Sequence, residues 1–265
     1  MPTWQELQDR GHGADHDYER GSPHLVHARL RNRIAEQVRR AVGRSFARHG
    51  RCRVLEIGAG HGAFTEFASA AGARVTVTEM SASSAAGLDR RFINNDRIRV
   101  VHDPDGESVL REDHRYDVIL CVSVLLHIPD YLGCVKRLTD VVEPGGDLIS
   151  FQDPMWYSRR GRLNMSAQWG AYFAWRMFQG DVVRGLRTRG RHLRGIRDER
   201  LESDMVEYHV VRQGVDERAL QGLLGDAFDA VSLVTYWSTQ SPALQELGDT
   251  LGLRSTFGLV ATGRH

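Results

Sequence analysis

Three glycines at alternate positions follow a short apolar segment and have the spacing of a ligand-binding turn. Residues 56–62 read EIGAGHG, and the residues just before them are apolar and β-favouring, as in a strand that is buried on both faces. Glycine permits a positive φ in a tight turn between a strand and a helix, and it lets a ligand approach the backbone. We therefore expect Gly58, Gly60 and Gly62 to form a ligand-binding loop.

The residues around this loop narrow the choice of ligand. Dinucleotide-binding loops read GxGxxG, whereas this loop is one residue tighter and begins with Glu56, whose carboxylate would repel a pyrophosphate and could attract a cation. A second predicted strand, residues 74–78, ends in Glu79. An acidic side chain about 20 residues beyond such a loop can accept hydroxyl protons from a ribose. A turn with only a structural role is the alternative.

With ExGxGxG at residues 56–62 and Glu79 at a strand end, the chain resembles the class I S-adenosylmethionine-dependent methyltransferases. The resemblance covers about residues 51–153 and extends in outline to the C-terminus. It implies that S-adenosyl-L-methionine is the cofactor, and it says little about the acceptor. The cofactor contacts that it implies are made by Glu56, Gly58, Ala59, Gly60, Gly62, Glu79, Met80, Asp103, Asp105, Val122 and Tyr18.

Two of these residues are alternatives for one role. Members of the family commonly carry an acidic residue just after the third strand, where it accepts a hydrogen bond from the adenine amino group. Asp103 and Asp105 both qualify, and an Asp-Pro-Asp-Gly turn accounts for at least one of them structurally. The sequence does not choose between them.

A histidine after the fourth predicted strand is the first candidate for a catalytic base. Residues 123–130 read SVLLHIPD and resemble the family segment that passes between the cofactor's methyl group and the acceptor. A histidine with a near-neutral pKa can accept a proton from a hydroxyl acceptor. His127 is therefore the first candidate and His209 the second. A packing or capping role for His127 is the alternative, and an ionised phenol or a neutral amine would need no base.

The pattern of elements predicts an α/β fold. We expect a seven-stranded, doubly wound and mostly parallel sheet in which an antiparallel strand seven pairs with strand six at the edge. Expected strands lie near residues 54–57, 74–78, 97–102, 116–122, 147–152, 230–237 and 256–262, with a turn at the EPGG of residues 143–146. Expected helices lie near residues 25–46, 81–94, 130–142, 216–224 and 242–251, with Ser81 as an N-cap.

The predicted organisation has four parts. Residues 1–48 form a helical N-terminal cap, residues 49–154 the cofactor-binding core, residues 155–207 a helical insertion or lid over the acceptor site, and residues 208–265 the rest of the sheet. The insertion begins with aromatic residues and methionines at helical spacing, which a packed helix explains equally well. Its arginines at residues 184–200 lack interleaved aromatics, so a solvated segment is favoured over an RNA-binding one. The expected acceptor contacts are His127, Trp156, Trp169, Tyr172, Tyr208 and Tyr236.

Composition excludes several classes of function. A net charge of +1 offers no global attraction for nucleic acid, and the longest apolar run is too short to span a membrane. Cys52, Cys121 and Cys134 have no metal-binding or CxxC spacing, so we expect buried thiols in a cytoplasmic protein. Beyond the fourth strand the chain offers Ser123 and His127 in place of acidic ligands, and we expect no metal. A homodimer is possible.

The leading hypothesis is a metal-independent methyltransferase that acts on a hydroxyl of a hydrophobic, natural-product-like small molecule. Residues 121–124 read CVSV, which differs from the [DN]PP[YF] motif of adenine and glutamine N-methyltransferases, and the Pro-Cys nucleophile of cytosine C5 enzymes is absent. Three alternatives remain: N- or C-methylation of a small molecule, methylation of RNA or protein, and a cyclase that binds the cofactor without transferring its methyl group.

Overall fold

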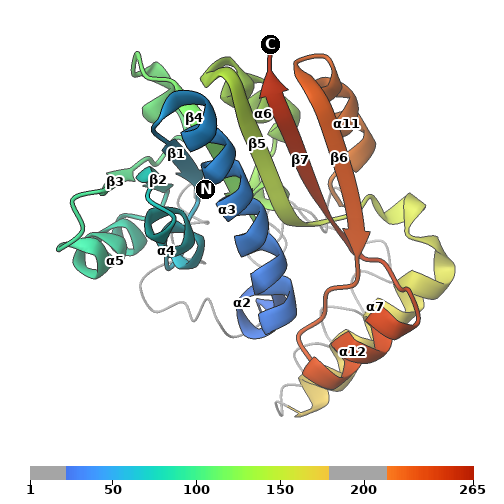
Figure 1. Ribbon diagram of the computed structural model, residues 1–265. Helices are drawn as coiled ribbons and strands as arrows, with labels where there is room; N and C mark the ends of the chain where they lie inside the picture. The colour runs from blue at the N-terminus through green and yellow to red at the C-terminus, as the bar shows by residue number, and fades with distance from the viewer. Residues whose placement is uncertain (1–21, 179–213) are drawn as a thin grey trace, which may run out of the picture.

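The computed structural model describes residues 22–178 and 214–265 of the chain, and these build a seven-stranded sheet with helices on both faces (Figure 1). The strand order is β3-β2-β1-β4-β5-β7-β6. β7 runs antiparallel to both of its neighbours, and the remaining neighbours pair in parallel, so the predicted fold is confirmed. The strands are β1 (Arg53–Ile57), β2 (Arg74–Glu79), β3 (Ile98–His102), β4 (Tyr116–Val122), β5 (Val142–Pro154), β6 (Phe228–Tyr236) and β7 (Thr256–Arg264).

The helices lie near their predicted positions, except that one expected helix is divided into two. The expected helix at residues 25–46 is split at His27, which has an extended backbone and whose Nε2 lies 2.6 Å from the carbonyl oxygen of Thr239. Ser81 caps α5 as predicted, because its side chain accepts a hydrogen bond from the backbone N–H of Ser84. The helices are α2 (Pro23–Val26), α3 (Ala28–His49), α4 (Ala63–Ala70), α5 (Ala82–Phe92), α6 (Tyr131–Asp140), α7 (Gly161–Phe178), α11 (Glu217–Gly225) and α12 (Pro242–Thr250). Short 3-10 turns are η1 (Val109–Arg111), η2 (Leu125–His127) and η3 (Tyr157–Arg159).

Two apolar layers bury the sheet. On one face α3 and α4 contribute Ile34, Val38 and Phe64 to a cluster with the strands, and on the other face α6 and α11 contribute Leu138 and Leu220. Every residue of β4 is buried, as expected of a central parallel strand that is covered on both sides. All three cysteines are buried and unpaired, as predicted. No helix in the described part of the chain combines the length and the apolar character that a membrane span requires.

The start of β5 differs from the prediction. The EPGG segment was expected to be a turn before the strand, yet β5 begins at Val142 and includes it. The pairing with β4 moves from Tyr116 opposite Val142 to Val118 opposite Asp147, so the segment loops out within the strand and does not precede it. This irregularity arises because Gly145 adopts a φ of +78°, which lets the chain double back and resume pairing.

The parallel strands place the predicted site residues at one edge of the sheet. β1, β2, β3, β4 and β5 run in the same direction, so their carboxyl ends meet at the lower edge in Figure 1, where α7 and α12 also lie. Open α/β sheets bind ligands in the crevice outside these carboxyl ends. We call this side the carboxyl edge and the opposite side the amino edge.

Candidate cofactor and active site

The glycine loop after β1 has the backbone that its sequence predicts. Gly58, Gly60 and Gly62 have φ values of +62°, +56° and +78°, which L side chains rarely adopt. A Cβ at Gly62 would lie 2.6 Å from the ring of Phe92, so this glycine is needed for packing against α5. A Cβ at Gly58 would lie 3.0 Å from the side chain of Val124. The loop is thus close-packed on α5 and on the segment after β4.

Glu79 connects the end of β2 to the glycine loop. One carboxyl oxygen accepts a hydrogen bond from the N–H of Gly60 at 2.9 Å, and the other accepts from the N–H of Met80 at 3.1 Å. Burial raises the pKa of Glu79, and these backbone hydrogen bonds oppose that rise. Ser81 also donates a backbone hydrogen bond to this carboxyl group, and the acceptor capacity that remains can take a hydrogen bond from a ligand hydroxyl.

The structure distinguishes the two aspartates that the sequence left as alternatives. Asp103 is 3% exposed, and its Oδ1 accepts from the N–H groups of Glu107 and Ser108 at 3.1 and 3.0 Å. Its Oδ2 is buried without a hydrogen-bond partner among the described residues. Asp105 is exposed and engaged by the Arg111 guanidinium, which lowers the pKa of this carboxyl to about 2. Only Asp103 therefore offers a buried acceptor atom to a ligand.

Glu56 lies beneath the loop and does not line a cavity. It is 2% exposed, and its Oε2 accepts a 2.5 Å hydrogen bond from the hydroxyl of Thr65 in α4. Burial raises the pKa of Glu56 to about 8, so most of this acid is neutral at pH 7. Its observed contact is with the start of α4, and the cofactor contact expected of it stays a prediction.

The segment after β4 supplies another wall. Ser123 has a φ of +58° although it is not glycine, and its N–H donates to the carbonyl of Phe151 in β5 at 2.8 Å. The chain then forms η2, which ends at His127. Ser123, Val124 and His127 line the cavity described next, whereas the predicted Val122 does not.

A cavity of about 390 Å³ at the carboxyl edge joins these parts. The predicted residues that line it are Gly58, Gly60, Glu79, Met80, Asp103, Asp105 and His127. Ser123, Glu107 and Arg137 also line it and were not predicted. Ser123 is the first residue of the predicted segment 123–130, and Glu107 directly follows the predicted turn at residues 103–106. Arg137 lies in α6, and no local signal marks it. The arrangement can hold a ligand with hydroxyl and amino groups and place a histidine beside it.

The sequence model of the methyltransferase domain matches residues 26–208, which is more than half of the chain. The chain belongs to the methyltransferase domain family. This finding confirms the family that the glycine loop and Glu79 indicate, and with it S-adenosyl-L-methionine as the cofactor.

Curated relatives and solved structures agree with this assignment. Ubiquinone biosynthesis O-methyltransferases of Aromatoleum aromaticum and Citrobacter koseri are 33% and 27% identical over 99 and 126 residues, which is 37% and 47% of this chain. The match covers 42% and 50% of those proteins, so the chain spans about half the length of the curated relatives it matches.

Two solved structures share the fold at low identity. The N-methyltransferase NodS from Bradyrhizobium japonicum, in complex with S-adenosyl-L-homocysteine, aligns over 100% of both chains with a TM-score of 0.55 and 16% identity. An O-methyltransferase family protein from Burkholderia thailandensis aligns over 89% of this chain and 57% of its own, with a TM-score of 0.51 and 14% identity. At these identities the likeness establishes the fold of the methyltransferase domain.

The described part of the segment predicted as an insertion does not line the cavity. In α7, Gln168 donates to the carbonyl of Ser238 at 3.3 Å, which fixes the helix against the connection between β6 and α12. The cavity lining includes none of Trp156, Trp169 and Tyr172. Their acceptor contacts therefore stay predictions.

Tyr236, which was expected at the acceptor wall, is buried in the sheet and does not line the cavity, so its acceptor contact stays a prediction. Its hydroxyl accepts from the N–H of Gln152 at 3.0 Å and donates to Gln152 Oε1 at 3.2 Å, so it supports the end of β5. Of the remaining predicted residues, Ala59 and Gly62 are in the loop but outside the cavity lining, and Tyr18, Tyr208 and His209 lie outside the described residues.

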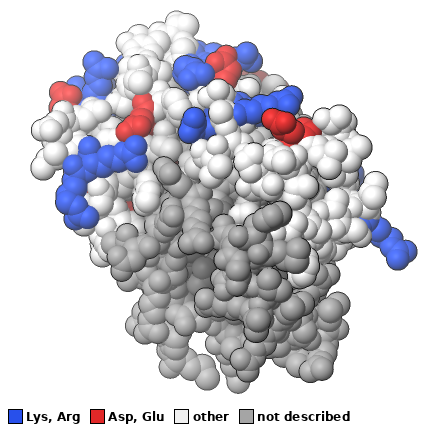
Figure 2. All heavy atoms as spheres, turned by 90° about the horizontal axis from the view of Figure 1, so that it is seen from below, with Lys and Arg blue, Asp and Glu red and all other residues white. Residues whose placement is uncertain are grey.

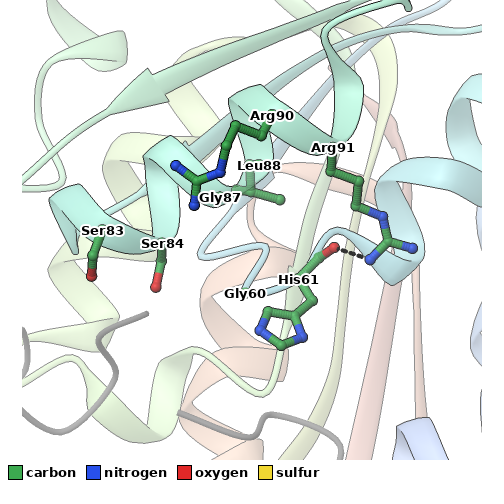
Figure 3. Close-up of a pocket in the computed structure, with 8 residues that line it drawn as sticks. All are labelled: Gly60, His61, Ser83, Ser84, Gly87, Leu88, Arg90 and Arg91. Carbon is green, nitrogen blue, oxygen red and sulfur yellow. Dashed lines mark hydrogen bonds between the residues drawn. The ribbon is translucent and has the colours of Figure 1, made fainter. Parts of the chain in front are cut away.

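A smaller hollow of about 200 Å³ lies between the glycine loop and α5 (Figure 3). The His61 ring points into it, and Arg90 and Arg91 approach it from α5. Arg91 donates to the carbonyl of His61 at 2.5 Å and to Glu66 of α4 at 2.8 Å. This arginine therefore fixes the glycine loop between the two helices, and Gly60 is common to both cavities.

Described residues of both charges are visible from the carboxyl edge (Figure 2). In Figure 2, which looks onto this edge from below, basic and acidic side chains are interspersed among uncharged ones. Within residues 22–178 and 214–265, no group of three or more His, Cys, Asp or Glu side chains has the arrangement of a metal site.

Proposed function

We propose that this chain transfers a methyl group from S-adenosyl-L-methionine to a hydroxyl oxygen of a hydrophobic, natural-product-like small molecule, without a metal. The observation that carries the proposal is the single cavity lined by the glycine loop, Glu79, Asp103 and His127. A cofactor-binding surface and a potential base thus face the same space, which the in-line displacement of methyl transfer requires.

The residues of this cavity fit the cofactor. The unpartnered Oδ2 of Asp103 can accept from an amino group, and the carboxyl group of Glu79 can accept from a ligand hydroxyl. Gly60 lines the cavity, so a side chain at this position would enter the space proposed for the cofactor. When bound, S-adenosyl-L-methionine supplies a methyl group that is activated by its attachment to a sulfonium sulfur.

His127 is proposed as the residue that accepts the proton of the acceptor hydroxyl. A hydroxyl is a weak nucleophile until its proton is removed, and a positioned general base contributes about 10²- to 10⁴-fold to the rate. The name of the curated relatives, ubiquinone biosynthesis O-methyltransferase, supports oxygen as the attacking atom. The apolar side chains of Ile57, Val124 and Ile128 in the cavity lining support a partly hydrophobic acceptor.

Cofactor binding is tested by calorimetric titration with S-adenosyl-L-methionine and S-adenosyl-L-homocysteine. Gly60→Arg, which introduces a side chain at a φ of +56°, should weaken binding at least ~100-fold because it fills the loop. Gly50→Arg is the matched control: Gly50 ends α3 with a φ of +65°, and a Cβ added there would meet no atom within 4 Å. Equal affinity of both variants for the cofactor would contradict the site.

The attacking atom is tested by screening phenolic, alcoholic and amine acceptors for S-adenosyl-L-homocysteine formation. We expect a hydroxyl acceptor, and His127→Gln should lower kcat for it by about 10²- to 10⁴-fold while cofactor affinity changes little. Unchanged kcat in this variant would exclude His127 as the base. Turnover of amines alone would replace O-methylation by N-methylation.

A further inference from the structure

A buried carboxyl group at the end of β5 contacts the turn that carries His127. Asp153 is 0% exposed, and its Oδ1 accepts a hydrogen bond from the backbone N–H of Leu126 at 3.0 Å. Leu126 is the residue before His127 in η2. Its N–H belongs to the first turn of a short helix, where backbone donors have no partner within the helix. Asp153 therefore supplies a partner that η2 does not supply itself.

The path of β5 is bent to make this contact possible. Residues three apart in a regular strand point to opposite faces of the sheet. Ser150 and Asp153 nevertheless meet, with the Ser150 hydroxyl donating to Asp153 Oδ2 at 3.0 Å, because the pairing with β7 shifts between Phe151 and Asp153. The intervening Gln152 adopts a φ of +71°, a strained conformation for a residue other than glycine.

Specific contacts hold this bulge in place. The Tyr236 hydroxyl bonds both the N–H and the side-chain oxygen of Gln152, and the Gln152 amide donates to the Ser238 hydroxyl at 2.5 Å. A strained residue persists only where its surroundings determine its conformation strongly. The bulge is thus built into the sheet, and its result is to aim Asp153 at η2.

We propose that Asp153 is the positioning residue for η2, and that it fixes the location of His127 and of the cavity wall formed by Val124 and Ile128. This inference rests on the proposed function, because it is the placement of His127 that gives the contact a catalytic consequence. Asp153 does not line the cavity, so it acts through the turn.

The contact with Leu126 is available in either protonation state of the carboxyl group. Burial raises the pKa of Asp153 to about 7, and the hydrogen bonds that it accepts oppose this rise. When the carboxyl is protonated at Oδ2, Oδ1 still accepts from Leu126, and the Ser150 hydroxyl can turn to accept the proton. An asparagine has the same ability, because its side-chain oxygen accepts and its amide group donates.

Asp117 provides a matched control elsewhere in the sheet. It is 1% exposed and accepts a hydrogen bond from the backbone N–H of Arg53 at 2.7 Å, but it lies at the start of β4, at the amino edge. Asp153→Ala and Asp117→Ala each remove a buried carboxyl that is bonded to a backbone donor. The difference in activity between these two variants therefore shows the effect of removing a carboxyl group that contacts η2.

The test compares wild type, Asp153→Ala, Asp153→Asn and Asp117→Ala in the full chain. Asp153→Ala should lower kcat about 10- to 100-fold, since small displacements of catalytic groups have effects of that size, with a change in acceptor KM below ~3-fold. Asp153→Asn should recover most of that loss. Asp117→Ala should lose stability while kcat and the affinity for S-adenosyl-L-homocysteine stay within ~2-fold of wild type. Equal effects of the two alanine variants, or no recovery by asparagine, would overturn the proposal.

An additional measurement separates this inference from the proposed function. The imidazole ¹⁵N resonances of His127, assigned with His127→Gln, should shift in Asp153→Ala and stay unchanged in Asp117→Ala, whether or not an acceptor is known. If methyl transfer is absent but the resonances shift, the proposed function fails and the positioning role stands. If they do not shift, the positioning role fails. Should Asp153→Ala not fold, Asp153→Ser replaces it, because a serine hydroxyl is too short to reach Leu126.

Discussion

Buried carboxyl groups have different partners at the two edges of the sheet. At the amino edge, Asp117 lies 3.5 Å from the Arg53 guanidinium, and Asp147 lies 2.8 Å from the Arg44 guanidinium. At the carboxyl edge, the buried Glu217 at the start of α11 pairs with the Arg159 guanidinium at 3.0 Å. The four other buried acids there accept hydrogen bonds from backbone N–H groups and hydroxyls, and no cationic side chain in the described part of the chain forms an ion pair with these four. These acids are Glu56, Glu79, Asp103 and Asp153.

This difference separates the acids that are paired with arginines at the amino edge from four acids that line the cavity or lie close to its walls. A buried acid paired with an arginine has its charge balanced within the protein. A buried acid without a cationic partner in the protein can still interact with a cationic ligand. The methyl donor proposed for this site is a cation. The two non-glycine residues with positive φ among the described ones also lie near the carboxyl edge: Ser123 directly follows β4, and Gln152 is in the last part of β5. Strain of this kind collects at functional sites.

The largest expected effect at an acid without a cationic partner is the pH dependence of stability that Glu56 causes. Its folded-state pKa of about 8 lies above the ordinary value of 4.5, so its contribution to stability is complete below pH 4.5 and is lost as pH rises through 8. Glu56→Gln keeps an acceptor for the Thr65 hydroxyl and does not ionise. By pH 9 the variant should therefore exceed wild type in unfolding free energy by a few kcal/mol more than at pH 5, on the order of the pKa shift.

Urea denaturation at pH 5, 7 and 9 measures this difference. Glu36→Gln is the control, because Glu36 is exposed, its pKa is lowered by Arg40 and Arg39, and it stays ionised over this range. If the difference in unfolding free energy between Glu56→Gln and wild type does not vary with pH, the pKa of Glu56 is not raised in the folded protein, and this prediction is wrong.

The next effect concerns the unpartnered oxygen of Asp103. Asp103→Asn should weaken the binding of S-adenosyl-L-homocysteine by about 10- to 100-fold, because hydrogen bonds to charged groups contribute about 1.5–3 kcal/mol and an amide cannot accept at both positions. Asp105→Asn should change the affinity less than ~2-fold, since Asp105 is exposed and paired with Arg111. Calorimetry measures both. Equal losses would show that burial does not distinguish the two aspartates.

The smallest effect tests the amino edge. Arg44→Ala removes the partner of the buried Asp147 carboxyl and should lower the free energy of unfolding by about 1–3 kcal/mol. Cofactor affinity should stay within ~2-fold of wild type, because this edge is remote from the cavity. Arg40→Ala, which breaks an exposed pair with Glu36 on the same helix, should cost much less. A loss of cofactor affinity in Arg44→Ala would break the distinction between the edges.

The features of the site that sequence reasoning predicted are those with local causes. The glycine spacing requires positive φ values that only this residue type adopts readily, and all three were observed. Ser81 caps α5 because a serine side chain reaches the N–H three residues later. Glu79 faces the loop because parallel strands end at the same edge. Each signal depends on residues within one strand, turn or helix.

The features that sequence reasoning missed depend on contacts between distant segments. Asp103 and Asp105 are the same residue type two positions apart, and only the path of the loop decides which carboxyl is buried. The contact of the Tyr236 hydroxyl with Gln152 in β5 likewise depends on the register of β6 and β7.

By itself the sequence determined the class of fold, the glycine loop and the acidic strand end, because hydrophobic periodicity and backbone preferences act over a few residues. The tertiary structure alone decided that Asp153 contacts the turn of His127. It also decided that Glu56, Glu79, Asp103 and Asp153 form no ion pair with a cationic side chain within the described ranges, whereas Asp117 and Asp147 do. The physical reason is that hydrogen bonds and ion pairs extend only about 3–4 Å, so they depend on strand register and on bulges that no local pattern specifies.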